Sequence, residues 1–473
     1  METSLEERLK VTKEMFVVPT TNGEYILYAP LQGALMRVNQ GVIGFLKRVN
    51  AGESPWATDA NLTRQLIDSK ILVSGSKDLV GNDDCFRQPK SYDPTGVTLL
   101  PTYNCNLRCV YCYANAGEAL TPNMPIEIAE SAIDLIVKNA LKTRQKSVSL
   151  GFHGGGEPFL PGHKDVVIRS TEYFRRKARL NNLQSSVGAV TNGVMRSDYL
   201  DWVVQNFDSL SISLDGTEDI QNRQRPKYSK TRDGASFPEV LSSIKFLEER
   251  KFKYGVRATI TSETVGRMSE IVDFFASICP SVSSYHLEPL FECGRCKTTK
   301  ELAPTEEAFL INLIEAQKTA KALGKSVYYS GGSLEKISDH FCGAAGSNFF
   351  VTPLGDVTTC LEVCRAEDPR SQIFYIGKYN PQTKKFEFDQ NKLANLKNRK
   401  VGNMPYCADC FAKFNCAGDC LAKSFSQTNS LLCNEGNSRC RINQGILLNE
   451  MIVKLATKPQ QNLKTETASK EHE

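Results

Sequence analysis

The chain has 473 residues, a formal net charge of +5 and 16 cysteines, and 41% of its residues are hydrophobic. This composition is typical of a globular protein with two or more domains, and the near balance of 58 basic and 53 acidic side chains argues against nucleic acid as a partner. The sequence contains no apolar run long enough to span a membrane, and residues 1–10 lack the apolar core of a signal peptide. We therefore expect a cytoplasmic protein with no membrane partner.

Residues 1–88 are predicted to form a small winged-helix-like module. Short strand-like and helical segments alternate with turns there, and strands around a small helical bundle are typical of such modules. The strand-like segments are 14–20, 24–31 and 71–75, and the helical segments are 41–50 and 62–70. Residues 89–96 are polar and contain proline, so we interpret them as a linker.

Residues 97–335 alternate between strand-like and helical segments. This alternation predicts a parallel sheet, either open or closed toward a barrel, covered by helices. Functional residues are then expected in the loops that follow the strands. The strand-like segments are 96–102, 147–154, 186–193, 209–216, 255–261 and 284–290.

Residues 336–445 are rich in cysteine, and residues 446–473 are predicted to be the end of a terminal helix and a polar, disordered tail. Stable disulfides are rare in the cytosol, so clustered cysteines in a cytosolic protein indicate metal binding. Two isolated cysteines, Cys85 and Cys279, are interpreted as plain thiols.

The stretch CNLRCVYC follows the first strand of the alternating region and has the spacing C-x3-C-x2-C. Three thiolates are one short of the four ligands of a structural zinc site or of an electron-transfer [4Fe–4S] cluster. The missing ligand favours an open cluster, in which one iron is free to bind a small molecule. The alternatives are three unrelated thiols or a zinc site completed by a distant residue.

With Tyr111 before its last cysteine, this loop resembles that of the radical S-adenosylmethionine (SAM) enzymes. The resemblance implies an α/β fold, a partial (β/α)6 TIM-like barrel, and a [4Fe–4S] cluster held by Cys105, Cys109 and Cys112. It further implies that the open iron binds SAM. Reductive cleavage of SAM would then give a 5′-deoxyadenosyl radical that removes a hydrogen atom from a C–H bond.

The segment HGGGEP at the end of the second strand extends this resemblance. Glycine lets a ligand approach the backbone closely, and the family's GGE motif, matched here by Gly155, Gly156 and Glu157, holds the amino group of SAM. We expect the Glu157 carboxylate to accept from that ammonium group. Ser213 and Arg225 are expected at the ribose and carboxylate of SAM, with a strand-end cap and a solvated charge as alternatives. Tyr111 and Asn192 complete the predicted SAM contacts.

The second cysteine group resembles the SPASM extension of radical SAM peptide-modifying enzymes, which carries two auxiliary [4Fe–4S] clusters. By that resemblance three cysteines bind the first auxiliary cluster: Cys342, Cys360 and Cys420. Four bind the second: Cys407, Cys410, Cys416 and a late cysteine, preferably Cys440, with Cys433 as the alternative. A zinc ribbon formed by four of these cysteines is the competing interpretation.

The fourth ligand of the first auxiliary cluster is left open by the sequence. The candidates are Cys293, Cys296 and Cys364. The position can also stay vacant for a thiolate of the substrate. The chain is therefore expected to bind SAM and three [4Fe–4S] clusters.

The N-terminal module resembles the peptide-recognition element of ribosomal-peptide maturases, which binds a precursor's leader peptide as an added strand. A purely structural appendage and a DNA-binding winged helix are the alternatives. The order of the modules implies a maturase that crosslinks a ribosomally made peptide, with a Cys thioether as the leading product and flavodoxin or ferredoxin as electron donor. The nearest competitor is a carbon–carbon or carbon–oxygen crosslink.

Two further functions were weighed. Sulfatase maturases carry an aspartate base directly after the cysteine matched here by Cys360, but this chain has Leu361, which cannot take a proton. No general base can be assigned from the sequence; Glu362 and Asp356 are merely close to Cys360 along the chain. A non-enzymatic scaffold with zinc or electron-transfer clusters would leave the open three-cysteine loop without a purpose.

Overall fold

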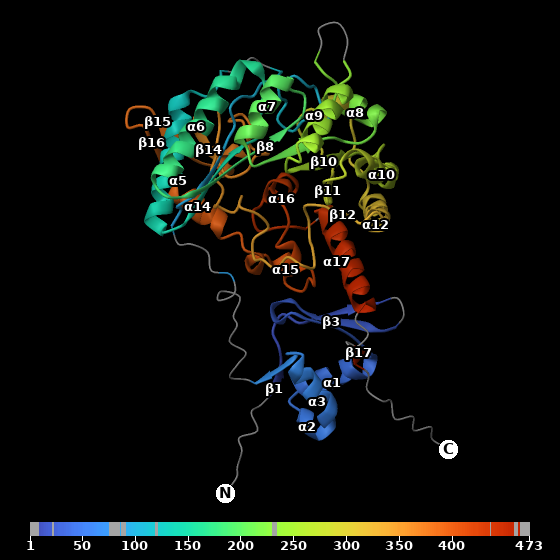
Figure 1. Cartoon of the computed structure of the whole chain (residues 1–473). Coiled ribbons are helices and arrows are strands. Elements are labelled where there is room, and N and C mark those ends of the chain that lie inside the picture. The colour runs from blue at the N-terminus through green and yellow to red at the C-terminus, as the bar shows by residue number, and fades with distance from the viewer. Residues whose placement is uncertain are drawn as a thin grey trace, which may run out of the picture.

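The computed structural model of the chain describes residues 9–20, 23–74, 86, 91–118, 122–228, 234–435, 437–457 and 462–463. Its main body is an α/β barrel, followed by a C-terminal region that lies between the barrel and a separate N-terminal module (Figure 1). Cys85 lies outside these ranges. Within them, no helix combines the length and the apolarity needed to cross a bilayer.

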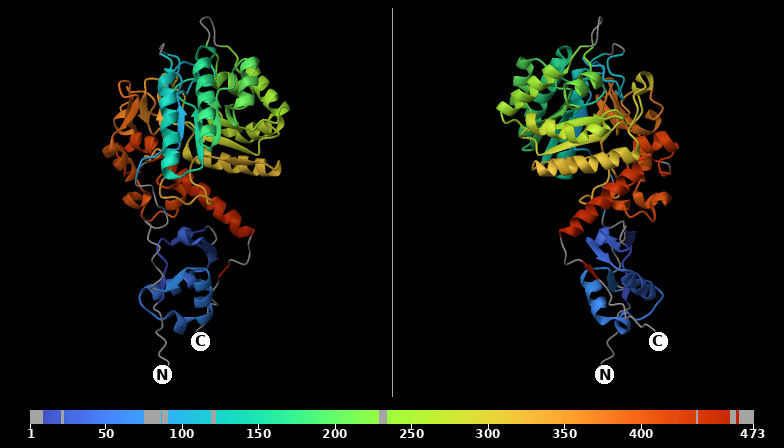
Figure 2. Two further views of the ribbon diagram at one scale, coloured as in Figure 1. Left: turned by 60° about the vertical axis from the view of Figure 1, so that its left-hand side comes forward. Right: turned by 90° about the vertical axis from the view of Figure 1, so that its right-hand side faces the viewer.

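Among the described residues, seven parallel strands form a partial barrel, which is open because β6 and β12 do not pair, and their spatial order follows their order in the chain, from β12 back to β6. Helices cover the outer face of this sheet (Figure 2). The strands are β6 (Gly96–Leu99), β7 (Ser147–Phe152), β8 (Gln184–Thr191), β9 (Ser209–Ser213), β10 (Tyr254–Ile260), β11 (Ser284–Pro289) and β12 (Ser326–Tyr328). The helices are α5 (Ile126–Thr143), α6 (Lys164–Leu180), α7 (Ser197–Asn206), α8 (Glu218–Gln224), α9 (Phe237–Glu249), α10 (Met268–Ile278), α11 (Cys296–Thr299) and α12 (Glu306–Ala322). The predicted α/β fold is confirmed, with β12 as an additional parallel strand.

The side chains of β10 show how the two faces of this sheet differ. Successive residues of a strand point to opposite faces. Val256, Ala258 and Ile260 are buried in the core on the helix side, whereas Arg257 and Thr259 line the pocket inside the barrel. Burial of one branched side chain stabilises the fold by about 1.5–3 kcal/mol, so the outward residues hold the helices on the sheet.

The cysteine-rich region continues the barrel sheet instead of forming a separate one. β13 (Phe350–Val351) pairs parallel with β6, and three antiparallel strands extend the sheet beyond it. These strands are β14 (Asp356–Thr358), β15 (Tyr375–Asn380) and β16 (Lys385–Phe388). The helices that follow or lie between them are α13 (Ser371–Phe374), α14 (Gln390–Lys397), α15 (Lys413–Cys416), α16 (Leu421–Thr428) and α17 (Arg439–Ala456). Short 3-10 turns are η1 (Pro30–Gln32), η2 (Pro161–His163), η3 (Val265–Arg267), η4 (Val401–Asn403) and η5 (Pro405–Cys407).

The described part of the N-terminal module contains two small sheets and three helices. Its strands are β1 (Leu9–Val11), β2 (Phe16–Pro19), β3 (Tyr25–Ala29), β4 (Ala34–Val38) and β5 (Leu72–Ser74), and its helices are α1 (Gln40–Asn50), α2 (Pro55–Thr58) and α3 (Ala60–Asp68). β1 and β4 are two strands that the sequence pattern does not predict. In β4, Met36 packs into the core of the module and Leu35 packs toward the C-terminal region. Because both faces are covered, β4 lacks the alternation of apolar and polar residues that marks a half-buried strand.

Apolar and polar contacts attach the module to the cysteine-rich region. Phe16, Ile26 and Leu35 share one apolar cluster with Leu447 and Met451 of α17. In addition, the Tyr28 hydroxyl donates to Asn415 Oδ1 at 2.8 Å.

The C-terminal tail also reaches the module. Asn462 and Leu463 form β17, which pairs parallel with Arg37 and Val38 of β4. At these two residues the structure differs from the disordered tail that the sequence predicted, because the edge of β4 offers backbone groups for pairing.

Candidate functional site

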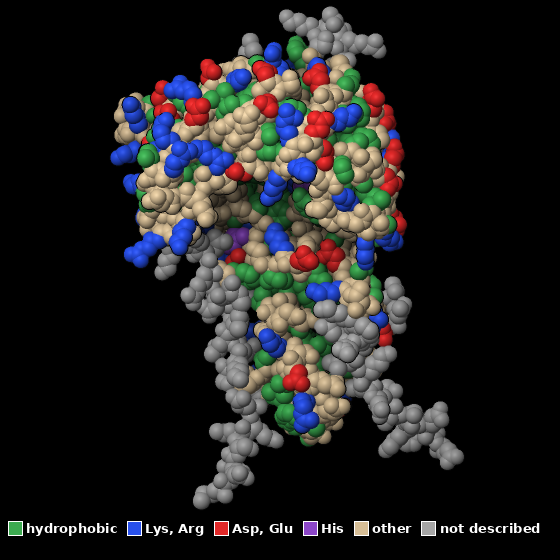
Figure 3. Space-filling view, in the orientation of Figure 1, with side chains coloured by type: hydrophobic (Ala, Val, Ile, Leu, Met, Phe, Trp, Pro, Cys, Tyr) green, Lys and Arg blue, Asp and Glu red, His purple; other side chains and the backbone are tan. Residues whose placement is uncertain are grey.

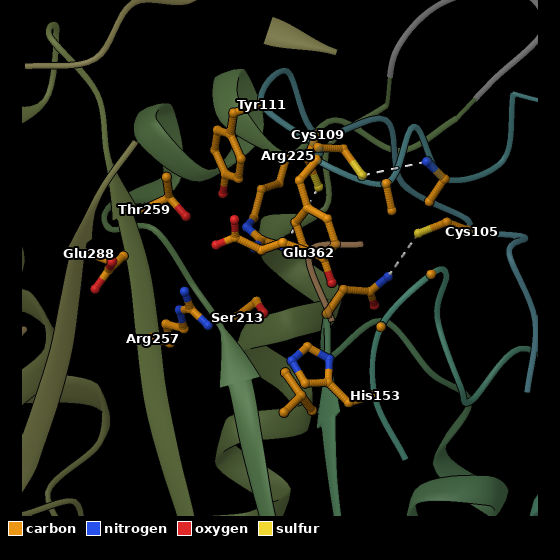
Figure 4. Close-up of a pocket in the computed structure, with 18 of the residues that line it drawn as sticks. Cys105, Cys109, Tyr111, His153, Ser213, Arg225, Arg257, Thr259, Glu288 and Glu362 are labelled. Atoms are coloured by element: carbon orange, nitrogen blue, oxygen red, sulfur yellow. Dashed lines mark hydrogen bonds between the residues drawn. The ribbon is translucent and has the colours of Figure 1, made fainter. Parts of the chain in front are cut away.

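The three-cysteine loop lies at the end of β6 and forms one wall of a pocket at the mouth of the barrel (Figure 4). Cys105, Cys109 and Cys112 all line this pocket. N–H groups donate to each of the three sulfurs: Leu107 N to Cys105 at 3.4 Å, Arg225 Nη1 to Cys109 at 3.6 Å and Ala116 N to Cys112 at 3.5 Å. Such donors suit thiolate ligands, whose charge they stabilise.

The thiols have the chemistry that a cluster would require. Burial raises the pKa of Cys109 to about 11, and it also raises the pKa of Cys105. Free thiols with such pKa values stay protonated at neutral pH, and binding of a metal centre displaces their protons. The donor set of three thiols on one loop, each with an N–H partner, therefore fits a [4Fe–4S] cluster with one open iron.

Gly155 and Gly156 lie directly beneath the cysteine loop. A Cβ atom on Gly156 would lie 2.1 Å from the carbonyl oxygen of Asn104, and one on Gly155 would lie 2.8 Å from Cδ1 of Tyr103. Gly155 also has a φ of +69°, a conformation that favours glycine. These positions therefore require glycine for packing of the loop, which is a reason separate from ligand binding.

Glu157 is buried, and its carboxylate accepts three hydrogen bonds from other groups of the protein. Oε1 accepts from the Thr191 hydroxyl at 2.6 Å and from Phe159 N at 3.1 Å, and Oε2 accepts from Asn192 N at 2.7 Å. A carboxylate has about four acceptor positions, so one position on Oε2 is left for a ligand. Burial raises the pKa of Glu157 to about 7, although the three hydrogen bonds act in the opposite direction.

Asn192 links the second and third strand ends to the loop. Its Nδ2 atom donates to Asn106 Oδ1 at 2.7 Å and lies 3.7 Å from Cys105 Sγ. Ser213 at the end of β9 also lines the pocket. All of the residues predicted to contact SAM therefore line one cavity: Tyr111, Gly155, Gly156, Glu157, Asn192, Ser213 and Arg225.

Asp215 is a site residue to which the sequence analysis assigned no role. It is fully buried. Its Oδ2 atom accepts from the hydroxyl of Tyr111 and from Arg225 Nε at 3.2 Å, and its Oδ1 atom accepts from Thr259 N at 3.0 Å. Asp215 therefore orients two predicted SAM contacts. The segment SLDG after a strand is the signal that could have indicated it.

The opposite wall of the pocket is a network of buried charges between the barrel and the C-terminal region. Glu288 of β11 accepts from Lys423 Nζ at 3.2 Å and from Arg439 Nη1 at 2.8 Å. Arg439 also donates to Asp419, at 2.9 Å. No sequence motif indicates this network, which holds α16 and α17 against the barrel.

Glu362 extends from the C-terminal region into the same pocket. Its Oε1 atom lies 3.8 Å from Lys423 Nζ, and its Oε2 atom is buried without a hydrogen-bond partner among the residues that the structure describes. Asp356, the other acid near Cys360 in the sequence, lies on β14 with its Oδ1 atom 3.5 Å from Lys378 Nζ and does not line the pocket. Leu361 packs beside Gly154.

A second cavity, of about 300 Å³, is lined by four of the late cysteines: Cys407, Cys410, Cys416 and Cys440. Asn443 Nδ2 donates to Cys416 Sγ at 3.2 Å, and Gln444 Nε2 donates to Cys410 Sγ at 3.3 Å. Cys433 does not line this cavity. Cys440 lies in the first turn of α17, whereas the sequence predicted it immediately before that helix.

Cys342, Cys360 and Cys420 also lie near one another, since the thiols that most influence the pKa of Cys360 are Cys420 and Cys342. Of the candidate fourth ligands, Cys293 lines the pocket of the three-cysteine loop together with Glu362, Cys296 donates to the carbonyl of Cys293, and Cys364 packs near the three-cysteine loop. Over the described ranges, no three His, Cys, Asp or Glu side chains are arranged to hold a single metal ion.

A wide groove of about 1390 Å³ adjoins the pocket of the three-cysteine loop, which we call the predicted SAM pocket, and shares Tyr113, Cys293 and Glu362 with it. In the space-filling view the molecule is hollowed between the barrel and the C-terminal region, with both basic and acidic side chains around the opening (Figure 3). The pocket therefore has an entrance large enough for a chain-like substrate.

Comparison with known proteins was consistent with this site. Residues 99–275 match the family described as the Radical SAM superfamily. The chain is 25% identical over 213 residues to the sporulation killing factor maturation protein SkfB of Bacillus subtilis, covering 45% of this chain and 44% of SkfB. It is 20% identical over 280 residues to the subtilosin biosynthesis protein AlbA of the same organism, covering 56% of this chain and 55% of AlbA. The chain thus spans about half the length of these two relatives.

Solved structures share the fold, and two of them show the extent of the similarity. One is anSMEcpe with bound AdoMet and the Cp18Cys peptide, with a TM-score of 0.60, 20% identity, and coverage of 76% of this chain and 98% of that one. The other is SuiB of Streptococcus suis bound to its precursor peptide SuiA, with a TM-score of 0.51, 14% identity, and coverage of 91% and 99%.

Proposed function

We propose that this chain, a radical SAM enzyme, installs intramolecular crosslinks on a ribosomally synthesised precursor peptide, and that these crosslinks are Cys thioethers. One observation carries the proposal. The pocket of the three-cysteine loop is completed by Lys423 and Glu362 of the cysteine-rich region and opens into a wide groove. One pocket thus joins the predicted radical site to side chains of the cysteine-rich region, and the adjoining groove gives a peptide an entrance.

Within this cavity, Cys105, Cys109 and Cys112 would hold the [4Fe–4S] cluster, and the glycine backbone with Glu157 would face the amino group of SAM. When bound, the cluster and SAM supply a radical able to remove a hydrogen atom from a C–H bond. The chain's own part is to orient and to shield. Asp215 fixes the positions of Tyr111 and Arg225, and the walls of the barrel keep solvent from the reacting carbon.

Thioether formation removes two hydrogens from the peptide. One hydrogen atom leaves the attacked carbon and ends in 5′-deoxyadenosine, and the cysteine thiol loses a proton as its sulfur bonds to that carbon. The remaining electron needs an acceptor, which we assign to the auxiliary clusters. Cys407, Cys410, Cys416 and Cys440 would hold one of them. Cys342, Cys360 and Cys420 would hold the other, whose fourth position is open to a substrate thiolate. Flavodoxin or ferredoxin would supply the electron that starts each turnover.

The N-terminal module is proposed to bind the leader part of the precursor. Its sheet has the order β17-β4-β3-β2, and extended peptides bind such sheets by adding a strand at an edge. The module packs on α17, whose first turn carries Cys440. A leader bound there would therefore be tethered to the same region that forms one wall of the pocket.

A carbon–carbon or carbon–oxygen crosslink is the second candidate, because the pocket residues do not select the atom that attacks the carbon. A reaction like that of sulfatase maturases is disfavoured by Leu361, which packs against Gly154 and offers no base next to Cys360.

The test is anaerobic reconstitution with iron and sulfide, followed by SAM, a reductant and the cysteine-containing precursor encoded beside the gene. We expect 5′-deoxyadenosine, a loss of two daltons per crosslink, and one thiol fewer available for alkylation at each loss. Replacement of Cys105, Cys109 and Cys112 together by Ala should abolish 5′-deoxyadenosine while the auxiliary iron is retained. A two-dalton loss with every thiol still alkylated would instead support a carbon–carbon or carbon–oxygen bond.

A further inference from the structure

The interior of this barrel is unusually open on one side. Barrel interiors are ordinarily filled by layers of Val, Ile and Leu. Here a hollow of about 750 Å³ runs along the inner face of β6 to β9 and meets the predicted SAM pocket at His153 and Val190. The side chains of that face are small, because its inward positions are Ser149, Gly151, Ser186, Gly188, Ser209 and Ser211.

Arg257 stands where this hollow meets the pocket. It points inward from β10, between Glu288 and Ser213 (Figure 4). It lies two residues before Thr259, whose backbone N–H donates to Asp215. At about 3.3 Å per residue of strand, Arg257 is therefore about 7 Å deeper in the barrel than the residues around Asp215.

The guanidinium of Arg257 has no hydrogen bond or ion pair with any part of the chain that the structure describes. The other two cations of the pocket are paired, Arg225 with Asp215 at 3.2 Å and Lys423 with Glu288 at 3.2 Å. Arg257 is thus the exception among them.

The two acidic side chains that line the pocket with Arg257, Glu288 and Glu362, form their ion pairs with Lys423 instead. Both oxygens of the Glu288 carboxylate already have partners: Oε1 accepts from Lys423, Arg439 and Ser330 Oγ, and Oε2 accepts from Ser330 N and lies 3.2 Å from His286 Nε2. His153 does not compete for an anion, because burial, together with the charge of Arg257, lowers its pKa to about 4 and leaves the ring neutral.

An unpaired charge held partly away from water is costly unless a ligand compensates it. A guanidinium presents a planar set of donors that matches the two oxygens of a carboxylate. From this geometry we infer that Arg257 binds a carboxylate of the peptide substrate, either an Asp or Glu side chain or the C-terminal carboxylate, and so fixes the peptide in the barrel below SAM. This inference rests on the proposed function, since it supplies a substrate determinant for the same pocket.

The carboxylate of SAM is the other possible source of the same chemistry. Arg225 is the better partner for it, since Arg225 Nη1 lies 3.6 Å from Cys109 Sγ and therefore beside the predicted cluster. Arg257 lies on the far side of Ser213 from the cysteine loop (Figure 4). The experiment must nevertheless separate the two sources.

The experiment uses reconstituted full-length enzyme in four forms: wild type, Arg257→Gln, Arg257→Lys and Arg250→Gln. Arg250 lies on the outside of the barrel after α9, with 39% of its side chain exposed, and serves as the matched control. The probe is the precursor peptide in three forms: unchanged, with its Asp and Glu residues replaced by Asn and Gln, and with a C-terminal amide. Crosslinking rates and the Kd of SAM are measured for each enzyme, and iron content and circular dichroism report on folding.

We expect Arg257→Gln to lower kcat/KM for the unchanged peptide about 10- to 100-fold, as for loss of a hydrogen-bonded charge pair. Arg257→Lys should recover part of this loss, and Arg250→Gln should show none. Peptide that lacks the recognised carboxylate should react with wild type as slowly as unchanged peptide reacts with Arg257→Gln, and the two changes together should add no further loss.

Fully additive losses, or a rate for Arg257→Gln equal to that of wild type, would overturn the inference and leave the proposed function intact. A loss of SAM affinity as large as the loss in kcat/KM would assign Arg257 to SAM instead. If wild-type enzyme forms 5′-deoxyadenosine but leaves every form of the peptide unchanged, the proposed function fails, and this inference fails with it.

Discussion

Asp215 and Arg225 form a buried ion pair at the mouth of the barrel, with 3.2 Å between Oδ2 and Nε. The same carboxylate oxygen accepts from Tyr111, and Arg225 Nη1 reaches Cys109. One acid that contacts no predicted ligand directly therefore positions the aromatic residue of the cysteine loop and a predicted SAM contact. It couples the loop after β6 to the ends of β9 and β10.

Replacement of Asp215 by Asn should weaken both folding and SAM binding. The variant leaves Arg225 buried without its counter-charge, and breaking a buried pair in this way costs about 3–5 kcal/mol. Chemical denaturation of the cluster-free protein and equilibrium binding of SAM to the reconstituted enzyme measure the two effects. Asp201→Asn, at a position with 46% of its side chain exposed, is the control. Equal behaviour of the two variants would show that Asp215 does not orient the site.

The late cysteines allow a matched comparison of iron content. Cys440 lines the second cavity with Cys407, Cys410 and Cys416, whereas Cys433 does not. After anaerobic reconstitution, Cys440→Ala should lose up to about four irons per chain, the content of one [4Fe–4S] cluster, and Cys433→Ala should lose none. Iron analysis and electron paramagnetic resonance of the reduced proteins give the answer. The reverse result would exchange the roles of the two cysteines.

Arg439 is the central cation of the network between the barrel and α17, and it is paired with both Glu288 and Asp419. Arg439→Met removes a charge shared by two buried carboxylates, so we expect unfolding to become easier by about 3–5 kcal/mol. Arg441→Met, two residues further on and 87% exposed, should change stability by less than about 0.5 kcal/mol. Similar denaturation midpoints for both variants would contradict the assigned role.

The raised pKa of Glu157 predicts a dependence of stability on pH. Its ordinary value is 4.5 and its value in the fold is about 7, so the folded protein keeps a proton that the unfolded chain releases. The associated stability is complete below pH 4.5 and is lost as the pH rises to about 7, by about 3 kcal/mol at most. We expect the stability of cluster-free wild type, relative to Glu157→Gln, to fall over this range and to stay constant above it. Parallel pH profiles for the two proteins would rule this out.

The sequence predicted the barrel well because each strand and its helix are local and strongly periodic. In α10, for example, Met268, Ile271, Val272 and Phe275 are all fully buried, at helical spacing. The extension of the sheet through β13 could not be predicted in this way, because its partner β6 lies about 250 residues earlier in the chain and its strands are only two to six residues long.

The two walls of the pocket also differ in whether their residues are close together in the sequence. The three-cysteine loop and the GGE segment are contiguous motifs, so their residue types and spacing can be read directly. Lys423 reaches Glu288 across 135 residues, and Arg439 reaches it across 151. Neither cation stands in a recognisable motif, and only the folded chain brings them to the pocket. Arg257 could not be predicted for another reason. It stands in an ordinary strand segment, GVRATIT, and its lack of an ion pair becomes visible only when the partners of Arg225 and Lys423 are known.

The pairing of β17 with β4 has a consequence for peptide recognition. The backbone groups on that edge of β4 can pair with only one strand at a time, and Asn462 and Leu463 already pair with Arg37 and Val38. A peptide that adds to this edge must therefore compete with the enzyme's own tail, whereas a peptide that adds beside β2 would not. The affinity measured for a leader at β4 would then reflect the free energy of pairing the leader with β4 minus that of pairing β17 with β4. A chain that ends at Thr457 lacks β17, so it should bind the leader more tightly than the full-length protein.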